Sequence, residues 1–302
     1  MNKTALTFLD HYRHLCYQEV SFALQQDILT GDINAELIQP HRLTAELWLK
    51  EPACLSGYYW FESSFNTLDP DIEIEWAYPE GSYLTPTSEK EALLVARITG
   101  QAQAILTAER TGLNFLQTLS ATATRVYQWV NTPALQASDI KLLDTRKTLP
   151  GLRFGQKYAV LVGGGYNHRL GLWDAYLIKE NHIAAAGSIA QAVSQARANQ
   201  PNRFIEVETE TLEEVESAIA AKVDRIMFDD FNYDQLLKGI ALVKAANQAN
   251  PHHLIETEVS GSLSQADLSR LTGIGLDYLS SGALTKHIQA IDFSLKMTEN
   301  SA

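Results

Sequence analysis

The sequence predicts an α/β protein in two parts: a small α/β layer with an antiparallel sheet, then parallel βα units that form a barrel or a doubly wound sheet. Two segments of the first part, residues 43–50 and 71–78, alternate apolar and polar residues as half-buried strands do. From residue 140 onward, short apolar runs alternate with helical stretches, which is typical of parallel strands and crossover helices. The 302 residues, 45% of them hydrophobic, suffice for one large globular domain or two ordinary ones.

The first part begins with a helix, because apolar residues recur at helical spacing from Leu6 to Ile28. The two alternating strands follow, and in the second Ile72 and Ile74 face away from Glu73. The next stretch, residues 99–130, lacks proline and has apolar residues at helical spacing, which predicts a long or broken helical connector. We place a domain boundary within this connector, so that the domains cover residues 1–114 and 115–287.

A polar or charged residue closes each apolar run of the βα part. Five of these closing residues lie 29, 21, 27 and 24 positions apart, about the length of one βα unit. Functional groups of a barrel gather at the carboxyl ends of its strands, so these residues predict an active site. A single polar residue of this kind could simply mark the point where a strand reaches solvent. This explanation is less satisfactory for five such residues in succession. They are Lys179, Glu208, Asp229, Glu256 and Ser280.

Charge and cysteine content exclude several classes of protein. The formal charge is −12, from 36 acidic and 24 basic side chains, and such a surface repels nucleic acid and anionic lipid. Two cysteines, Cys16 and Cys54, supply neither a disulfide framework nor a zinc-binding spacing. The N-terminus lacks a signal-peptide core, and no run approaches the ~20 apolar residues of a membrane span. We therefore expect a cytoplasmic protein that binds neither nucleic acid nor membrane.

One basic segment stands out in this acidic chain. Residues 144–182 hold six Lys and Arg but three Asp and Glu, a net charge of +3. Such an island suits a small polyanionic ligand, although an ordinary solvated face would show the same charges. Gly163, Gly164 and Gly165 allow a backbone to approach a ligand closely, but they match no nucleotide-binding loop. Cationic donors surround them in the sequence: Arg146, Lys147, His168, Arg169 and Lys179.

Three blocks of this segment carry a family resemblance: DTRKTLPGLR at 144–153, GGGYNHRLGL at 163–172 and LIKENH at 177–182. In this order and at these intervals they resemble the quinolinate phosphoribosyltransferase family. Further matches extend over almost the whole chain, namely QQDILTGD, ERTGLNFLQ, VET, IMFDD, VSGSL and LDYLSSGALTKH. The resemblance implies an N-terminal α/β sandwich, then an irregular, open α/β barrel of TIM-like type. It also implies that a C-terminal tail, residues 288–302, returns to the first domain.

The resemblance further implies an activity. Such an enzyme condenses quinolinate with phosphoribosyl pyrophosphate, giving nicotinate mononucleotide, CO₂ and pyrophosphate for NAD biosynthesis. It requires Mg²⁺ and no organic cofactor. It forms a homodimer, or an assembly of dimers, with shared active sites.

Site residues follow from the same resemblance, position by position. The cations around the quinolinate carboxylates and the phosphates would be Arg110, Arg146, Lys147, His168, Arg169 and Lys179. An acidic pair at the ribose and Mg²⁺–pyrophosphate end would be Glu208 and Asp229. Small-residue loops for the 5′-phosphate would be Ser260 with Gly261, and Ser281 with Gly282. The catalytic members would be Lys147, Lys179, Glu208 and Asp229, with Glu208 and Asp229 as metal ligands through the pyrophosphate.

These residue types suit the implied chemistry. Both substrates are polyanions, so cations must hold mutually repelling groups together. The ribose passes through an oxocarbenium-like state, which Glu208 or Asp229 could stabilise. The quinolinate nitrogen is itself the nucleophile, and no Ser/His/Asp triad is needed. Loss of the 2-carboxylate leaves a carbanion, which Lys147 or Lys179 could favour through its charge or by protonating C2.

Departures and alternatives remain. Asp230 replaces an asparagine that is common in the family, adding a negative charge beside the presumed metal site, and Ala121 replaces a glycine. His168 could instead be a structural cap, and Lys157 could be solvated. A catalytically silent member is expected to lose one of the four catalytic residues, all of which are present. A nicotinate phosphoribosyltransferase would bind one carboxylate only, and the surplus of cations argues against it.

Overall fold

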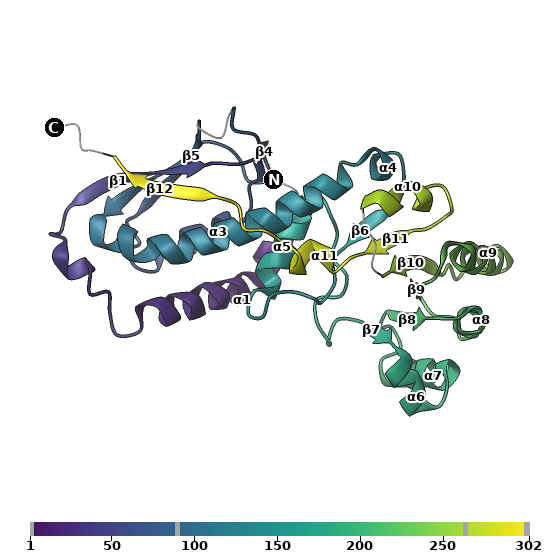
Figure 1. Cartoon of the computed structure of the whole chain (residues 1–302). Coiled ribbons are helices and arrows are strands. Elements are labelled where there is room, and N and C mark those ends of the chain that lie inside the picture. The colour runs from purple at the N-terminus through teal and green to yellow at the C-terminus, as the bar shows by residue number, and fades with distance from the viewer. Residues whose placement is uncertain (1–2, 88–90, 262–264, 299–302) are drawn as a thin grey trace. The chain divides into compact units, whose positions relative to one another are not determined.

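The computed structural model describes residues 3–87, 91–261 and 265–298, and the chain divides into two units (Figure 1). The first unit comprises residues 1–128, 147–165 and 283–302, and the second comprises residues 129–146 and 166–282. Among the described residues, no helix is both long enough and apolar enough to cross a membrane.

A four-stranded antiparallel sheet and its covering helices form the first unit. The strand order is β12-β1-β5-β3, with β1 at Arg42–Leu49, β3 at Glu73–Trp76, β5 at Leu93–Gln101 and β12 at Phe293–Met297. The helices are α1 (Lys3–Ile28), η1 (Ala35–Leu37), α2 (Tyr58–Asn66), α3 (Ala102–Val130), α5 (Arg153–Val162) and α11 (Ala283–Lys286). A small second sheet pairs β2 (Ala53–Cys54) with β4 (Tyr83–Leu84).

The core of this unit lies between the four-stranded sheet and the helices α2 and α3. Leu47 of β1 and Ile98 of β5 are fully buried with Phe61 of α2 and Leu116 of α3. The predicted connector is a single helix, but its first three residues were assigned wrongly, because residues 99–101 end strand β5. The C-terminal strand β12 lies along β1, with Leu295 opposite Leu47 (Figure 1).

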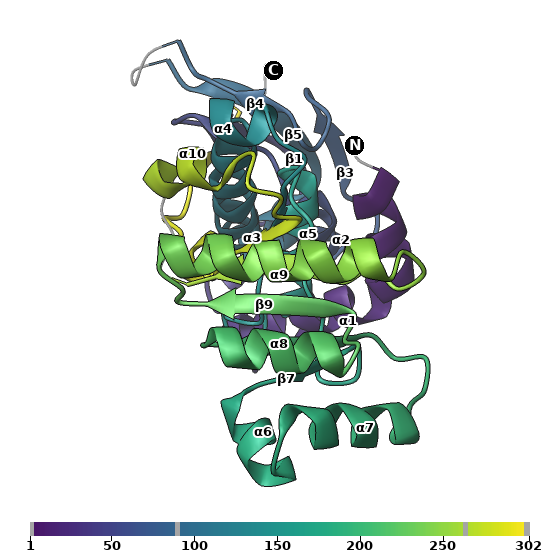
Figure 2. The same ribbon diagram turned by 90° about the vertical axis from the view of Figure 1, so that its right-hand side faces the viewer.

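The second unit is built on a six-stranded parallel sheet of order β6-β11-β10-β9-β8-β7. Its strands are β6 (Lys141–Leu143), β7 (Tyr176–Ile178), β8 (Ile205–Thr209), β9 (Arg225–Asp229), β10 (Glu256–Ser260) and β11 (Tyr278–Ser280). Its helices are α4 (Pro133–Gln136), α6 (Glu180–Ala186), α7 (Ile189–Asn199), α8 (Leu212–Ala220), α9 (Tyr233–Ala249), η2 (Gln265–Asp267) and α10 (Leu268–Leu271). Figure 2 shows α7, α8 and α9 following one another along the outside of this sheet.

The sheet of the second unit is open, since no pairing joins β6 to β7 among the described residues. The predicted fold class, an α/β sandwich followed by an open α/β barrel, is thereby confirmed. One strand end was placed wrongly. Glu256 begins β10 instead of closing a strand, because the β-branched segment ETEVS forms the strand. The boundary between domains at residues 114 and 115 stays a prediction.

A half-buried carboxylate, Glu19 of α1, caps the N-terminus of α5. It accepts hydrogen bonds from Phe154 N (3.0 Å), Gly155 N (3.1 Å) and Trp60 Nε1 (2.8 Å). The partial positive charge of a helix N-terminus favours an anion there. Burial is the larger effect, however, and it raises the pKa of Glu19 from 4.5 to about 7.

We expect this raised pKa to make stability depend on pH. The folded chain holds the Glu19 proton that the unfolded chain releases above pH 4.5, so this contribution is lost as the pH rises to about 7. The free energy of unfolding, measured with urea, should therefore fall by up to ~3 kcal/mol more in the wild type than in Glu19→Gln between about pH 5 and about pH 8. A constant difference between the two proteins across this range would contradict the assignment.

Candidate active site at the strand ends of the second unit

Charged side chains line one face of three neighbouring strands of the parallel sheet, at spacings of two or four residues along each strand. Because side chains alternate between the faces of a strand, Glu206 and Glu208 of β8 share a face, and Ile205 and Val207 take the other. By the same alternation, Arg225 and Asp229 share a face of β9, and Glu256, Glu258 and Ser260 share a face of β10. The charges therefore form successive layers from the amino ends of the strands toward their carboxyl ends.

The layer nearest the amino ends is an ion-pair cluster around Arg225. Its guanidinium donates to Glu256 Oε2 (2.6 Å) and to Glu258 Oε2 (3.0 Å). The Tyr278 hydroxyl donates to Glu256 Oε1 (3.0 Å), and the Tyr278 ring centroid lies 3.8 Å from Arg225 Cζ. This layer is structural, since each of its charges has a partner within the sheet.

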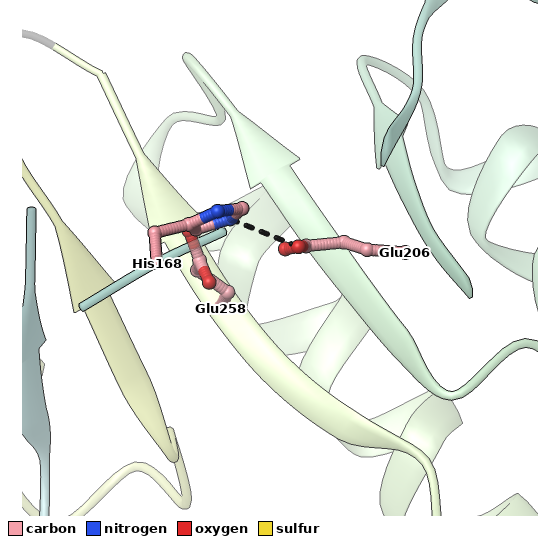
Figure 3. A group of neighbouring side chains, drawn as sticks. All are labelled: His168, Glu206 and Glu258. Atoms are coloured by element: carbon pink, nitrogen blue, oxygen red, sulfur yellow. Dashed lines mark ion pairs between the residues drawn. The ribbon is translucent and has the colours of Figure 1, made fainter. Parts of the chain in front are cut away.

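The middle layer consists of His168, Glu206 and Glu258 (Figure 3). The His168 Nε2 atom lies 2.9 Å from Glu206 Oε2 and 3.6 Å from Glu258 Oε1. Burial raises the pKa of Glu206 to about 7, and burial together with the Glu206 charge raises the pKa of Glu258 to about 8. Sequence reasoning missed Glu206 and Arg225, although period-two spacing from Glu208 and Asp229 could have found them.

The carboxyl ends of the strands carry the predicted catalytic residues of this unit. Lys179, directly after β7, forms an ion pair with Glu208 of β8. Asp229 ends β9, the strand beside β8. The structure thus brings three of the four predicted catalytic residues to neighbouring strand ends.

The loops after β9 and β10 are held against each other. Asp230 has a left-handed backbone (φ 52°), and its N–H donates to Ser260 O (3.3 Å). Gly261 also has a positive φ (144°), and a Cβ there would lie 2.6 Å from Asp230 Oδ1. The positive φ of Gly261 favours glycine at this position. The predicted phosphate-binding pair, Ser260 and Gly261, lies beside the Asp229 strand end.

Two arginines of this unit, Arg146 and Arg169, influence each other electrostatically. Burial lowers the pKa of Arg169, and the positive charge of Arg146 lowers it further. The carboxylates of Glu206, Asp174 and Glu208 act in the opposite direction on the pKa of Arg169. Guanidinium groups pair well with carboxylate and phosphate, so the two arginines suit such a ligand. Beyond β11, Ser281 donates its N–H to Leu143 O (3.1 Å) and is followed by Gly282.

Two predicted residues belong to the first unit. Arg110 of α3 lines a cavity of about 360 Å³ together with Asp27 and Asn114. Lys147 begins the loop before α5, and its carbonyl oxygen accepts a hydrogen bond from Thr285 Oγ1 (2.8 Å). The solvated alternative for Lys157 of α5 is wrong, because this side chain is fully buried.

Cationic side chains beside an acidic pair, at the carboxyl ends of an open parallel barrel, define an enzyme for small polyanionic substrates. Comparison with known proteins makes the class specific. Residues 27–120 match the family model for the N-terminal domain of quinolinate phosphoribosyl transferase, and residues 121–296 match the model for its C-terminal domain. The chain belongs to the quinolinate phosphoribosyltransferase family.

Relatives and solved structures agree with this family. The chain is 39% identical over 279 residues to a probable carboxylating nicotinate-nucleotide pyrophosphorylase of Synechocystis sp., covering 92% of this chain and 90% of that protein. It is 38% identical over 275 residues to the corresponding Bacillus subtilis protein, covering 90% of each. The solved nicotinate-nucleotide pyrophosphorylase of Francisella tularensis superimposes with a TM-score of 0.84 at 40% identity, covering 94% of this chain and 96% of that one.

Proposed function

We propose that this chain transfers the phosphoribosyl group of phosphoribosyl pyrophosphate to quinolinate, with loss of CO₂, giving nicotinate mononucleotide and pyrophosphate in NAD biosynthesis. The observation that carries the proposal is the Lys179–Glu208 ion pair beside the Asp229 strand end, in the same unit as Arg146 and Arg169. A substrate with two carboxylates offers these cations a partner for each charge. The family pattern predicts three further cations, namely His168 of the second unit and Lys147 and Arg110 of the first.

The remaining site residues have roles in the ribosyl transfer. The ring nitrogen of quinolinate attacks the anomeric carbon, and pyrophosphate leaves. Glu208 and Asp229, at adjacent strand ends, stabilise the positive charge that develops on the ribose. Backbone amides of the Ser260–Gly261 and Ser281–Gly282 pairs receive the 5′-phosphate, since glycine lets the chain approach a phosphate closely.

The acidic pair also fits Mg²⁺. Carboxylate oxygens are ligands that Mg²⁺ prefers, and this ion usually keeps several waters and binds one or two carboxylates plus substrate phosphates. Glu208 and Asp229 end neighbouring strands, which matches that demand. Bound there with phosphoribosyl pyrophosphate, Mg²⁺ would neutralise charge on the departing pyrophosphate. No organic cofactor enters this scheme.

Decarboxylation follows the transfer. The quaternised ring nitrogen accepts the electrons left by CO₂, and the resulting C2 carbanion must gain a proton. Lys179 or Lys147 supplies that proton or favours the carbanion by its charge. The ion pair of Lys179 with Glu208 keeps this ammonium at the strand ends.

Assembly and location complete the proposal. The chain acts as a homodimer, or as an assembly of dimers, with active sites shared between subunits. It works in the cytoplasm, without a nucleic-acid or membrane partner. These statements rest on the family pattern, the net charge of −12 and the bacterial relatives.

Quinolinate, and not nicotinate, is expected to be the substrate. With a monocarboxylate the arginines would remain partly unpaired, at a cost of ~2–5 kcal/mol for each desolvated charge without its partner. The measurement is release of labelled CO₂ from quinolinate with phosphoribosyl pyrophosphate and Mg²⁺, beside nucleotide formation from nicotinate. Comparable turnover of nicotinate would overturn the substrate assignment, and a chain inactive with both substrates would be a silent family member.

A further inference from the structure

His168 lies between the loop that carries Arg169 and two carboxylates of the sheet (Figure 3). Its side chain is 8% exposed, and the side chains of Glu206 and Glu258 are 3% and 0% exposed. Within this network the ring could be a metal ligand, an imidazolium cation or a neutral hydrogen-bonding group. The contacts of its two nitrogen atoms distinguish these states.

The Nδ1 atom of His168 is a hydrogen-bond acceptor. The backbone N–H of Arg169 donates to it over 2.7 Å. An N–H can donate only to an atom with a free lone pair, so Nδ1 carries no proton. The ring proton of neutral His168 is therefore on Nε2, which lies 2.9 Å from Glu206 Oε2.

This tautomer argues against a metal ion in the cluster. His168, Glu206 and Glu258 offer three potential ligand atoms within 4.8 Å of one another. A histidine that binds metal through Nε2 needs its lone pair there and usually donates its other N–H to an acceptor. His168 has the opposite arrangement, because Nδ1 already accepts an N–H.

The same contact argues against an imidazolium. A proton on Nδ1 would point at the Arg169 N–H across 2.7 Å. Three charged groups near the ring come from the sheet: Glu206 of β8, Glu258 of β10 and Arg225 of β9. Two more are Asp144, directly after β6, and Arg169, the next residue in the chain. The two carboxylates favour a positive ring, yet a neutral ring with its proton on Nε2 also turns a positive edge toward them and keeps the Arg169 contact.

His168 belongs to a series of side chains that hold three successive backbone amides. His168 N donates to Asp144 Oδ1 (2.9 Å), Arg169 N to His168 Nδ1 (2.7 Å) and Leu170 N to Asp174 Oδ2 (2.8 Å). Asp144 itself is fully buried and also accepts from Asn167 Nδ2 (2.6 Å). The backbone on both sides of Arg169 is thereby fixed relative to the sheet.

We propose that His168 is a positioning residue, which works as the neutral Nε2–H tautomer to hold Arg169 in place and contributes no positive charge to the substrate site. The inference rests on the proposed function, in which Arg169 binds a quinolinate carboxylate. It replaces the expectation that His168 is one of the cations around the substrate.

Two substitutions separate the two ring nitrogens. Asn places its Oδ1 one bond beyond Cγ, as Nδ1 is, so His168→Asn keeps an acceptor for Arg169 N–H. Gln places its amide nitrogen near the position of Nε2, so His168→Gln keeps an N–H on the side of Glu206 and loses the acceptor for Arg169 N–H. We expect KM for quinolinate to rise about tenfold more in His168→Gln than in His168→Asn, because an N–H without a partner is costly. Exposed His252, changed to Asn and to Gln, is the matched control and should leave KM unchanged.

A second readout needs no activity. NMR of the wild type with ¹⁵N-labelled histidine rings, with His168 assigned by comparison with His168→Asn, should show the Nε2–H tautomer at neutral pH. An imidazolium signal from His168, or equal losses of quinolinate affinity in the two variants, would overturn the proposal. A wild type that does not turn over quinolinate would instead contradict the proposed function, and the tautomer would still be measured.

Discussion

Asp229→Asn is expected to lower kcat by at least about a hundredfold while quinolinate binding, measured separately by calorimetry, changes little. The substitution keeps the shape of the side chain and removes its charge. Asp229 ends β9 next to the Glu208 strand, at the end of the sheet that we assign to the ribose and pyrophosphate. Its charge is therefore needed in the transition state, when the ribose becomes positive and pyrophosphate leaves, and not for binding the pyridine ring.

The neighbouring carboxylate provides a matched control. Asp230→Asn removes the same charge one position further, and its left-handed backbone (φ 52°) accepts asparagine well. This variant should keep a kcat near that of the wild type. Loss of quinolinate binding in Asp229→Asn, with unchanged turnover at saturation, would show that the roles had been assigned to the wrong residues.

Mixing two inactive variants, Arg110→Ala and Lys179→Ala, is expected to restore about a quarter of wild-type activity. Arg110 lies on α3 of the first unit and Lys179 follows a strand of the second. If Arg110 reaches the substrate of the neighbouring subunit, each variant damages both sites of its own homodimer. A hybrid dimer then carries one doubly damaged site and one intact site.

The size of the recovery follows from random exchange of subunits. About half of the dimers become hybrids, and each hybrid has one working site of two. Exchange itself is verified with two affinity tags, and a mixture of Lys179→Ala with Glu208→Gln is the control. Those two residues are partners in one chain, so that mixture should stay inactive. Proven exchange without recovery would mean that Arg110 acts within its own chain.

Much of the fold could be predicted from sequence because it follows from local periodicity. Alternation at period two located β1 and β3, and helical periodicity located α3. Glu256 was misplaced because the apolar run before it resembles a strand, while the β-branched residues after it form one. Strand β12 pairs with β1 across more than 240 positions. Local periodicity contains no signal for such a distant partner, and only the family resemblance implied that the C-terminal tail returns to the first domain.

The site was predictable where its residues carry family motifs and not where partners come together only in space. Lys179, Glu208 and Asp229 could be named from strand ends and motifs. The residues that hold these side chains in place could not be named in this way. Arg225 neutralises carboxylates of a neighbouring strand, and Asp144 binds amides in a loop 24 positions away. The state of His168 likewise depends on the single direction in which the Arg169 amide points.

The ion pairs around Arg225 also determine how β9 and β10 align. In the observed register Glu256 is opposite Arg225, and Ser260 is opposite Asp229. A slip of β10 by one residue would turn both of its glutamates toward the covering helices and bring Thr257 and Val259 to the inner face. Arg225 would then be buried without its partners, at a cost of ~3–5 kcal/mol. The polar interior of this barrel thus selects one alignment of its strands, and that alignment places Asp229 and Ser260 at the same height.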